Sequence, residues 1–596
     1  MVRELEYPFD SEYILKKSKK IRRQLLESGT NFLSKKIAVL GGSTTHDVIR
    51  VLEVFLLNRG IQPVFYESEY AQYWQDVMFD NPELAEFAPD LIYIHTSNRN
   101  ILCYPTAADG TERIDALLEE QYEHFRVMWD KIEEKYHCPV IQNNFEYPFY
   151  RILGNREAVL AQGRISFLNR LNERFYQYAR EHESFYINDI NYMSAAYGLD
   201  KWADPLYWHM YKYAMCMQAI PEFAYNLSNI IKAIFGKNKK SLVLDLDNTL
   251  WGGIVGDDGV ENLEIGQETS IGQVYSEFQA YLKAQKDIGV MLNVNSKNEY
   301  DNAVTGLNHP DGILRPEDFI LIKANWEPKS RNIAAIAEEL NIMPDSLVFV
   351  DDNPAERDIV GVQIPGVAVP EIGTPEQYIR VLDHAGFFEV TSLSEDDRRR
   401  NEMYKANMER EKLQQNFGDY REYLKSLEMK GTIGPFEPIY MARIAQLTNK
   451  SNQFNLTTKR YTQGDIEKFA RSEEYITRYG KLEDKFGDNG VVSVVIGRKD
   501  GLEKVLHLEL WLMSCRVLKR DMEYAMMDSM VQACRKNGIE AMMGYYCPTA
   551  KNAMVREFYA AMGFAKIHEK EDGSTVWRYD IPADYRNKNT VISVSL

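Results

Sequence analysis

The chain has 596 residues, which is too many for one hydrophobic core and predicts three or four domains. Its 88 acidic and 70 basic side chains give a net charge of −18, which argues against a nucleic-acid partner because binding DNA or RNA requires clustered Lys and Arg. We expect no membrane span, since no run approaches the roughly 18 apolar residues required. The first residues, MVRELEYPFDSEY, do not resemble a signal peptide. The six cysteines form no C-x-x-C pair, so we expect a cytoplasmic protein without a disulfide framework or zinc site.

The first predicted domain covers residues 1–235. A strand, a glycine turn and a helix are predicted over KKIAVLGGSTTHDVIRVLEVFLL, and further buried strands over DLIYIHTS and PVIQNNF. Helical stretches lie between these strands. Strands that alternate with helices predict a parallel sheet with helices on both faces.

The second predicted domain covers residues 236–390 and is again of the α/β class. Its predicted strands are SLVLDLDNTL, GVMLNVNS, DFILIKA and SLVFVDD, and the stretches between them are predicted to be helical. Each strand ends in polar side chains. Since ligands bind at the carboxyl edge of open parallel sheets, we expect a site at that edge.

The third part begins with a linker helix, predicted within residues 391–428. A capping box at Ser394–Asp397 starts it, and it runs to about Gln414 with its charged residues forming a solvated face. Residues 429–596 predict an α+β domain with the order helix, helix, hairpin, helix, strand, helix, strand. The hairpin turns through Lys499, Asp500 and Gly501.

One helix of this last domain carries a sulfur-rich stripe on a single face. The spacing matches the 3.6-residue helical period, and the residues are Met522, Met526, Met530 and Cys534. We interpret the stripe as core packing and not as a cofactor-binding surface.

The residues that carry chemistry lie in the second domain. Asp245 and Asp247 stand two apart at a strand end, in D-L-D-N-T-L, so strand alternation places both carboxylates on one face. A D-x-D pair alone is weak evidence for a functional site, because it occurs by chance in long chains. Three further strand-end or helix-start signals support it, and they are Ser296, Lys329 and the pair Asp351 and Asp352.

This set matches the needs of phosphoryl transfer. A phosphoryl group repels an anionic nucleophile, so a hard cation such as Mg²⁺, held by carboxylate oxygens, must offset the charge. One carboxylate attacks the phosphorus, and a second protonates the leaving group and later deprotonates water. A hydroxyl and an ammonium hold the phosphoryl oxygens as charge redistributes.

The order of these residues resembles the four motifs of the haloacid dehalogenase (HAD) superfamily. The resemblance implies that Asp245 is the nucleophile and a Mg²⁺ ligand, and that Asp247 is the general acid and base with its backbone carbonyl on Mg²⁺. It also implies that Ser296 binds the phosphoryl group and that Lys329 bridges this group and Asp245. Asp351 would ligate Mg²⁺ with help from Asp352.

A finer resemblance is carried by LVLDLDNTLWGGIVGDDG, NWEPKSRNI, FVDDNPAERDIV and SNQFNLTTKRYT, which together look like the FkbH-like proteins. The resemblance implies dephosphorylation of a glycerate-like acyl donor and loading of the acyl unit on the phosphopantetheine of an acyl carrier protein. Too few residues separate Ser296 from Lys329 for a cap domain, and WGGIVGDDG reads as a glycine-rich flap. Two alternatives stay open: a plain capless phosphatase, and a noncatalytic assembly module.

The end of the chain resembles the closing motif of the GNAT acyltransferases, through Asn552, Tyr559 and Gly563-Phe564. The loop expected to bind acyl-CoA begins at Arg516 but lacks the usual glycines, and Asp521 places a negative charge where phosphate would bind. Ordinary CoA binding is therefore not expected, although Lys519 and Arg520 would still attract a phosphopantetheine.

Cys515 stands directly before this loop. Thiolates are favoured near helix N-termini and cations, so it is a candidate to hold the acyl group as a thioester. The alternative is an inert, buried cysteine.

The first domain resembles the SGNH hydrolases through the turn ending at Ser43 and through Asn98. In that pattern Ser43 is the nucleophile and Asn98 an oxyanion donor. The Asp-x-x-His pair of that family is absent, and its nearest candidate, Asp204 with His209, has too long a spacing. We therefore expect a noncatalytic SGNH-like domain that serves in carrier docking.

Overall fold

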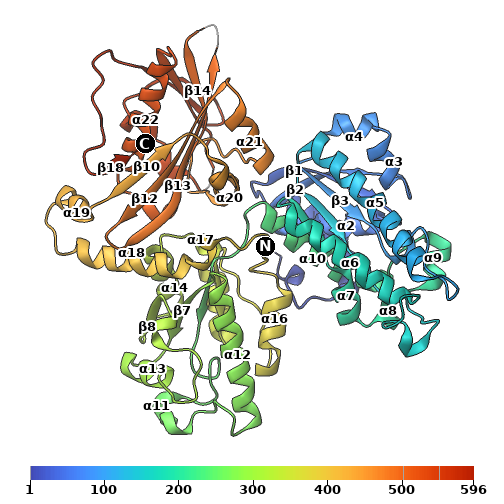
Figure 1. Cartoon of the computed structure of the whole chain (residues 1–596). Helices are drawn as coiled ribbons and strands as arrows, with labels where there is room; N and C mark the ends of the chain where they lie inside the picture. The colour runs from blue at the N-terminus through green and yellow to red at the C-terminus, as the bar shows by residue number, and fades with distance from the viewer. Residues whose placement is uncertain (1, 501–502, 550, 596) are drawn as a thin grey trace. The chain divides into compact units, whose positions relative to one another are not determined.

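The computed structural model describes residues 2–500, 503–549 and 551–595 (Figure 1). The chain divides into two compact units. The first runs to Lys237 and also includes His384–Ser392, and the second consists of Asn238–Asp383 and the chain from Leu393 onward. Among the described residues, no helix combines the length and apolar character needed to cross a bilayer.

The first unit is a five-stranded parallel sheet with helices on both faces. The strand order is β2-β1-β3-β4-β5. The strands are β1 (Leu33–Gly41), β2 (Ile61–Glu67), β3 (Leu91–His95), β4 (Val140–Asn143) and β5 (Phe185–Asn188). The helices are α1 (Ser11–Leu26), α2 (His46–Asn58), α3 (Tyr73–Met78), α4 (Pro82–Phe87), α5 (Thr111–Tyr136), α6 (Arg164–Glu181), α7 (Ile190–Tyr197), α8 (Leu199–Trp202), α9 (Pro205–Tyr211) and α10 (Ile220–Ile234).

Two apolar clusters in this unit cover the opposite faces of the sheet. One contains side chains of α1, α2 and α10, and the other contains side chains of α5 and α6. The strands predicted at DLIYIHTS and PVIQNNF are β3 and β4, and both are buried along their whole length. The doubly covered parallel layer predicted from the alternating strands and helices is confirmed.

The second unit opens with a four-stranded parallel sheet of order β8-β7-β6-β9. The strands are β6 (Ser241–Leu244), β7 (Met291–Ser296), β8 (Leu321–Ala324) and β9 (Leu347–Val350). The helices are α11 (Val255–Asp258), α12 (Ser270–Asp287), α13 (Tyr300–Leu307), α14 (Lys329–Glu339), α15 (Pro354–Gln363) and α16 (Tyr378–His384). All four strands predicted for this domain form. Because β6 and β9 are parallel neighbours, the residues that follow them meet at one edge.

The predicted linker helix forms in three pieces, α17 (Glu395–Arg398), α18 (Arg400–Gln414) and α19 (Tyr420–Ser426). The side chain of Ser394 caps α17 by accepting a hydrogen bond from the Asp397 backbone N–H. The interpretation of its charges as a solvated face holds for Arg398, Glu402 and Glu409, which are exposed, and is wrong for two others. Asp397 and Arg410 are 4% and 2% exposed, since Asp397 pairs with Arg400 and Lys450 and Arg410 pairs with Asp484 of a later strand.

The last part of the chain is built on a mixed sheet of order β16-β17-β15-β14-β13-β12-β10-β18, with β11 also paired to β14. The strands are β10 (Lys430–Gly434), β11 (Phe454–Asn455), β12 (Tyr475–Asp484), β13 (Gly487–Asp500), β14 (Val505–Met513), β15 (Ala541–Tyr546), β16 (Ala565–Glu569), β17 (Thr575–Asp580) and β18 (Ser593–Ser595). The helices are α20 (Met441–Lys450), α21 (Gln463–Arg471), α22 (Met522–Lys536) and α23 (Phe558–Ala561).

Within this sheet, β13 and β14 are antiparallel, as predicted for the hairpin, and Gly501 of its turn lies outside the described residues. The prediction missed β12, which forms the long pair with β13. The strands β14 and β15 run parallel, with α22 between them along the chain. All four members of the predicted stripe on α22 are fully buried, which confirms their packing role.

Candidate active site

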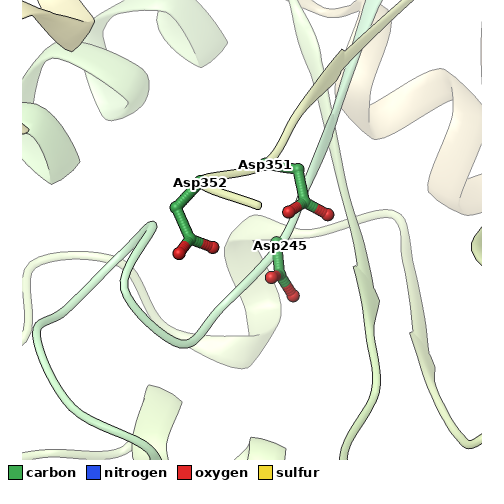
Figure 2. A group of neighbouring side chains, drawn as sticks. All are labelled: Asp245, Asp351 and Asp352. Carbon is green, nitrogen blue, oxygen red and sulfur yellow. The ribbon is translucent and has the colours of Figure 1, made fainter. Parts of the chain in front are cut away.

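Three carboxyl groups converge at the carboxyl edge of the four-stranded sheet. Asp245 follows β6, and Asp351 and Asp352 follow the neighbouring β9. Figure 2 shows the three side chains gathered where these two segments lie beside each other, and one carboxylate oxygen of each lies within 4.8 Å of the others. The parallel pairing of β6 with β9 brings them together, with the Asp245 N–H donating to the Val350 carbonyl at 3.0 Å.

Lys329 lies among these carboxylates. It is the first residue of α14, and its Nζ is 2.9 Å from Oδ2 of Asp245 and 2.5 Å from Oδ2 of Asp351. The Asn295 amide donates to the Lys329 carbonyl at 2.9 Å and so holds the helix start against β7. Burial acts to lower the pKa of Lys329, but the charges of Asp245 and Asp351 outweigh it and raise that pKa.

The cluster is buried and rich in negative charge. Burial, together with the charge of Asp245, raises the pKa of Asp351 to about 6, and the same two causes raise the pKa of Asp352. Oδ1 of Asp245 is buried and has no hydrogen-bond partner among the described residues. Three converging carboxylates with one orphaned oxygen are the donor set that a hard divalent cation prefers, so these residues fit a Mg²⁺ ion.

Asp247 is held separately from these three. Its Oδ1 accepts from the Trp251 indole N–H at 3.0 Å and from the Val255 N–H at 3.1 Å, and its Oδ2 accepts from the Asn298 amide at 2.7 Å. The side chain of Asp247 is therefore outside the group that gathers round Asp245. Burial raises its pKa, which favours the protonated form of the carboxyl group.

Two polar residues that the sequence analysis missed support these groups. Asn298 lies two residues after Ser296, the buried last residue of β7, and its amide joins Ser296 to Asp247, with a 3.5 Å contact to the Ser296 hydroxyl. Thr249 accepts the Asp352 N–H at 3.2 Å. Both residues follow the end of a strand. A polar residue at that position of the sequence could have indicated each of them.

The edge that carries these groups has a flap but no cap domain. The flap is a short antiparallel contact in which Gly252 and Glu264 exchange backbone hydrogen bonds, followed by α12. The segment between Ser296 and Lys329 consists of α13, β8 and a single 3₁₀ turn. No inserted domain covers the site from either of these segments, as the sequence predicted.

The candidate acyl-loading residues lie after β14. Cys515 is half-buried and its Sγ is 3.9 Å from the Tyr404 hydroxyl. Arg516 donates to the Ser514 hydroxyl and lies 3.6 Å from Asp396. The expectation that Arg520 would attract a phosphopantetheine is wrong, because its buried guanidinium is paired with Asp484 and bonded to Asn407.

The remaining residues of the closing motif are enclosed. The Asn552 amide donates to the carbonyls of Asn455 and Cys547, and its oxygen accepts the Thr549 N–H at 2.7 Å, so it ties three loop segments together. Tyr559 is fully buried, its hydroxyl has no partner among the described side chains, and burial raises its pKa. A role for either residue in acyl transfer stays a prediction.

No hydrogen bond among the described residues joins the three residues of the SGNH pattern. Ser43 is buried and its hydroxyl has no partner in the described part of the chain. Asn98 donates through its amide and its backbone N–H to Glu146. His209 is exposed on α9, and no hydrogen bond among the described residues links it to Ser43 or Asn98. That the first domain is noncatalytic stays a prediction.

Comparisons with known proteins found a family model that matches the first domain and a solved structure that matches a larger part of the chain. Residues 36–232 match the model of the FkbH N-terminal domain. A crystal structure of the N-terminal part of the protein BF1531 from Bacteroides fragilis, which contains a phosphatase domain and was complexed with Mg, shares 30% identity at a TM-score of 0.58. The match covers 63% of this chain and 99% of that one.

Two further solved structures match a smaller part. A ribosomal-protein-S18-alanine N-acetyltransferase from Escherichia coli has 12% identity and a TM-score of 0.21, covering 27% of this chain and 99% of that one. Ard1 from Thermoplasma volcanium has 20% identity and a TM-score of 0.20, covering 26% and 98%. No curated protein matches the chain.

The four-stranded sheet with its carboxylate and lysine cluster defines a phosphatase domain of the HAD type. The same chain carries an FkbH N-terminal domain, over residues 36–232, in front of this phosphatase domain.

Proposed function

We propose that this chain is a Mg²⁺-dependent phosphoryl-transfer enzyme of the FkbH type. It would dephosphorylate a phosphorylated, glycerate-like acyl donor and load the acyl unit on an acyl carrier protein. The observation that carries the phosphatase part is the cluster in which Lys329 lies between Asp245 and Asp351 while Oδ1 of Asp245 stays without a partner.

Asp245, Asp351 and Asp352 would hold the magnesium ion, joined by the backbone carbonyl of Asp247. When bound, this ion supplies the positive charge that offsets the repulsion between a phosphoryl group and an anionic nucleophile. The crystallised Bacteroides fragilis relative carries Mg beside a phosphatase domain, which supports the choice of metal.

The residues of the chain would then act in two steps. A carboxylate oxygen of Asp245 attacks phosphorus, the bond from phosphorus to the leaving oxygen breaks, and Asp247 gives that oxygen its proton. In the second step Asp247 takes a proton from water, whose oxygen attacks phosphorus and frees Asp245 and inorganic phosphate. Lys329 and Ser296 would hold the phosphoryl oxygens throughout.

The raised pKa of Asp247 supports its part in this scheme. The neighbouring Asn298 amide and Trp251 indole both donate hydrogen bonds to its carboxylate, and they hold the carboxylate in one orientation. The flap that contains Trp251 and Val255 therefore positions the proposed acid.

For acyl loading, Cys515 is the proposed carrier of the acyl group. The donor would then carry two phosphates, an ester phosphate that Asp245 removes and an acyl phosphate. The thiolate would attack the carbonyl carbon of the acyl phosphate, a carbon–sulfur bond would form, and the carbon–oxygen bond to that phosphate would break. The carrier's phosphopantetheine thiol would attack this thioester, form a new carbon–sulfur bond and free Cys515. The half-buried position of Cys515 at the start of a turn after β14, next to Arg516, supports this reading.

A plain capless phosphatase is the second candidate, and the enclosed state of Arg520 and Tyr559 favours it. In that case the flanking domains would only recognise the substrate. Acyl loading requires Cys515 and plain phosphatase activity does not, so one experiment can separate the two candidates.

The test is mass spectrometry of the protein after incubation with a candidate acyl phosphate and a phosphopantetheine-bearing carrier protein, with phosphate release measured in parallel. Loading should be lost in Cys515→Ala while phosphate release survives, and Cys547→Ala, another half-buried cysteine, is the matched control. Phosphate release without loading in either protein would leave the plain phosphatase, and equal loading by both would exclude Cys515 as the acyl carrier. Asp245→Asn should release no phosphate from a phosphomonoester, and equal release by this variant and wild type would support the noncatalytic assembly module.

A further inference from the structure

An unusually apolar helix lies on the surface of the first unit, at the carboxyl edge of its five-stranded sheet. Helix α9 has the sequence PLYWHMY, and although all seven of its residues are described, none is buried. A helix of this composition is normally packed into a core, because leaving it in water costs about 25 cal/mol per Å² of apolar area. Its exposure therefore indicates a use in binding.

The side chains that α9 exposes are large, and the neighbouring loops add to them. The exposed fractions are 63% for Leu206, 57% for Met210 and 50% for Tyr211 on α9, and 62% for Ile152 in the loop after β4. Single exposed apolar residues need no explanation, but a contiguous group of them marks an interaction site.

Ring contacts make this group continuous. The Arg99 guanidinium, after β3, lies 5.1 Å from the Trp208 ring centroid on α9 and 6.0 Å from that of Phe149, after β4. The rings of Phe149 and Tyr150 are 5.0 Å apart. Three segments far apart in the sequence therefore form one surface, the α9 surface, made by residues 99–102, 149–152 and 206–212.

The helix at the centre of this surface is fixed at both ends. Asp204 caps it by accepting the Tyr207 N–H at 3.0 Å. At the other end, the Tyr211 carbonyl accepts the Thr44 hydroxyl at 2.6 Å, and the Lys212 carbonyl accepts the Thr44 N–H at 3.0 Å. A surface whose backbone is already fixed loses little entropy on binding, so the fold presents it ready for a partner.

The charge of this region is opposite to that of the chain. Six basic and three acidic side chains occur in the α9 surface and its flanks, residues 98–104, 147–164 and 199–214. The chain as a whole has a net charge of −18. Arg156 and Lys201 are exposed, whereas Glu157, one of the three acids, is buried. A partner that carries carboxylates beside apolar side chains complements such a surface.

We propose that the α9 surface docks the acyl carrier protein of the proposed function, on which this inference rests, through a face of the carrier that combines carboxylates with apolar side chains. The carboxylates would meet Arg156 and Lys201, and the apolar side chains would cover Leu206 and Met210. A second copy of this chain fits less well, since a twofold axis would bring the same basic residues together. An anionic membrane would also face the rest of a chain with net charge −18.

The test is isothermal titration of the full-length protein, without acyl donor, with a purified acyl carrier protein of net negative charge that bears its phosphopantetheine. We expect micromolar binding at low salt, and binding about tenfold weaker at about 0.5 M salt, because salt screens the charges.

Two variants and a matched control locate the interaction. Met210→Asp should weaken binding by at least about tenfold, and Lys201→Glu by about threefold or more. Phe79→Asp, which changes an exposed aromatic residue directly after α3 of the same unit, should leave the affinity within about twofold.

Several outcomes would overturn the proposal. They are no carrier binding by the wild type, equal binding by Met210→Asp, and a wild-type dimer in sedimentation that Met210→Asp dissociates. Phosphatidylglycerol vesicles that bind the wild type and not Met210→Asp would also overturn it. Loading at the wild-type rate by Met210→Asp at low carrier concentration would overturn the docking surface and leave the loading reaction. Carrier binding that Met210→Asp abolishes, without any acyl loading, would refute the loading reaction and support the surface.

Discussion

Replacing Lys329 by methionine tests the electrostatic account of the phosphatase site. The Lys329 side chain is 4% exposed and lies 2.9 Å from Asp245 and 2.5 Å from Asp351, which are themselves almost fully buried. At an effective dielectric constant of about 20, each contact is an attraction of about 6 kcal/mol before the cost of desolvation. Without the ammonium, carboxylates within 4.8 Å of one another remain, and each charged pair repels by at least about 3.5 kcal/mol.

We expect Lys329→Met to lower the free energy of unfolding by about 3–5 kcal/mol in EDTA, because it leaves uncompensated buried charge. For a domain of this size that corresponds to a fall in midpoint of about 10 °C. Saturating Mg²⁺ should recover more stability in the variant than in wild type, since the metal replaces the lost positive charge. The assay is thermal unfolding followed by circular dichroism, with and without Mg²⁺.

Two controls sharpen this measurement. Lys323→Met removes a partly exposed lysine paired with Glu339 and should cost less than about 1 kcal/mol. Adding Asp351→Asn to Lys329→Met removes the remaining repulsion and should restore part of the lost stability. The reasoning is refuted if Lys329→Met is as stable as wild type in EDTA, or if Mg²⁺ stabilises the two proteins equally.

Three further changes follow from the same contacts. Asn298→Ala removes the amide that holds Asp247 and should lower kcat for phosphate release by about tenfold to hundredfold, while Asn308→Ala, an exposed asparagine directly after α13, should leave it unchanged. Met530→Ala empties a fully buried position on α22 and should cost about 2–5 kcal/mol in urea unfolding, and a loss below about 1 kcal/mol would contradict the packed core. The pKa of Glu146, raised by burial from 4.5 to about 7, makes its ionisation unfavourable in the folded state, so its contribution to stability is intact below pH 4.5 and falls by up to about 3 kcal/mol as pH rises through 7. Glu146→Gln should lack this loss in thermal unfolding between pH 5 and 8, and parallel curves for the two proteins would exclude it.

Local sequence determined the phosphatase domain to a large extent. Short apolar runs with polar ends specify strands such as β6 and β9, and the parallel fold then places every carboxyl end at one edge. Asp245 and Asp351 therefore meet although 106 positions separate their numbers. The same reasoning predicted the buried stripe on α22, because its spacing carries the helical period.

Only the tertiary structure decided which charges are buried and which partners they have. The charged residues of α17 and α18 were predicted to form a solvated face. Asp397 and Arg410 are nevertheless buried, and they form ion pairs with residues of α20 and β12. Arg520 looked free to bind phosphate, but its guanidinium is taken by Asp484. Asn98 fitted a hydrolase pattern, whereas in the fold it holds Glu146, which follows β4. Burial and pairing depend on which distant segments come together, so a periodic pattern within one segment cannot specify them.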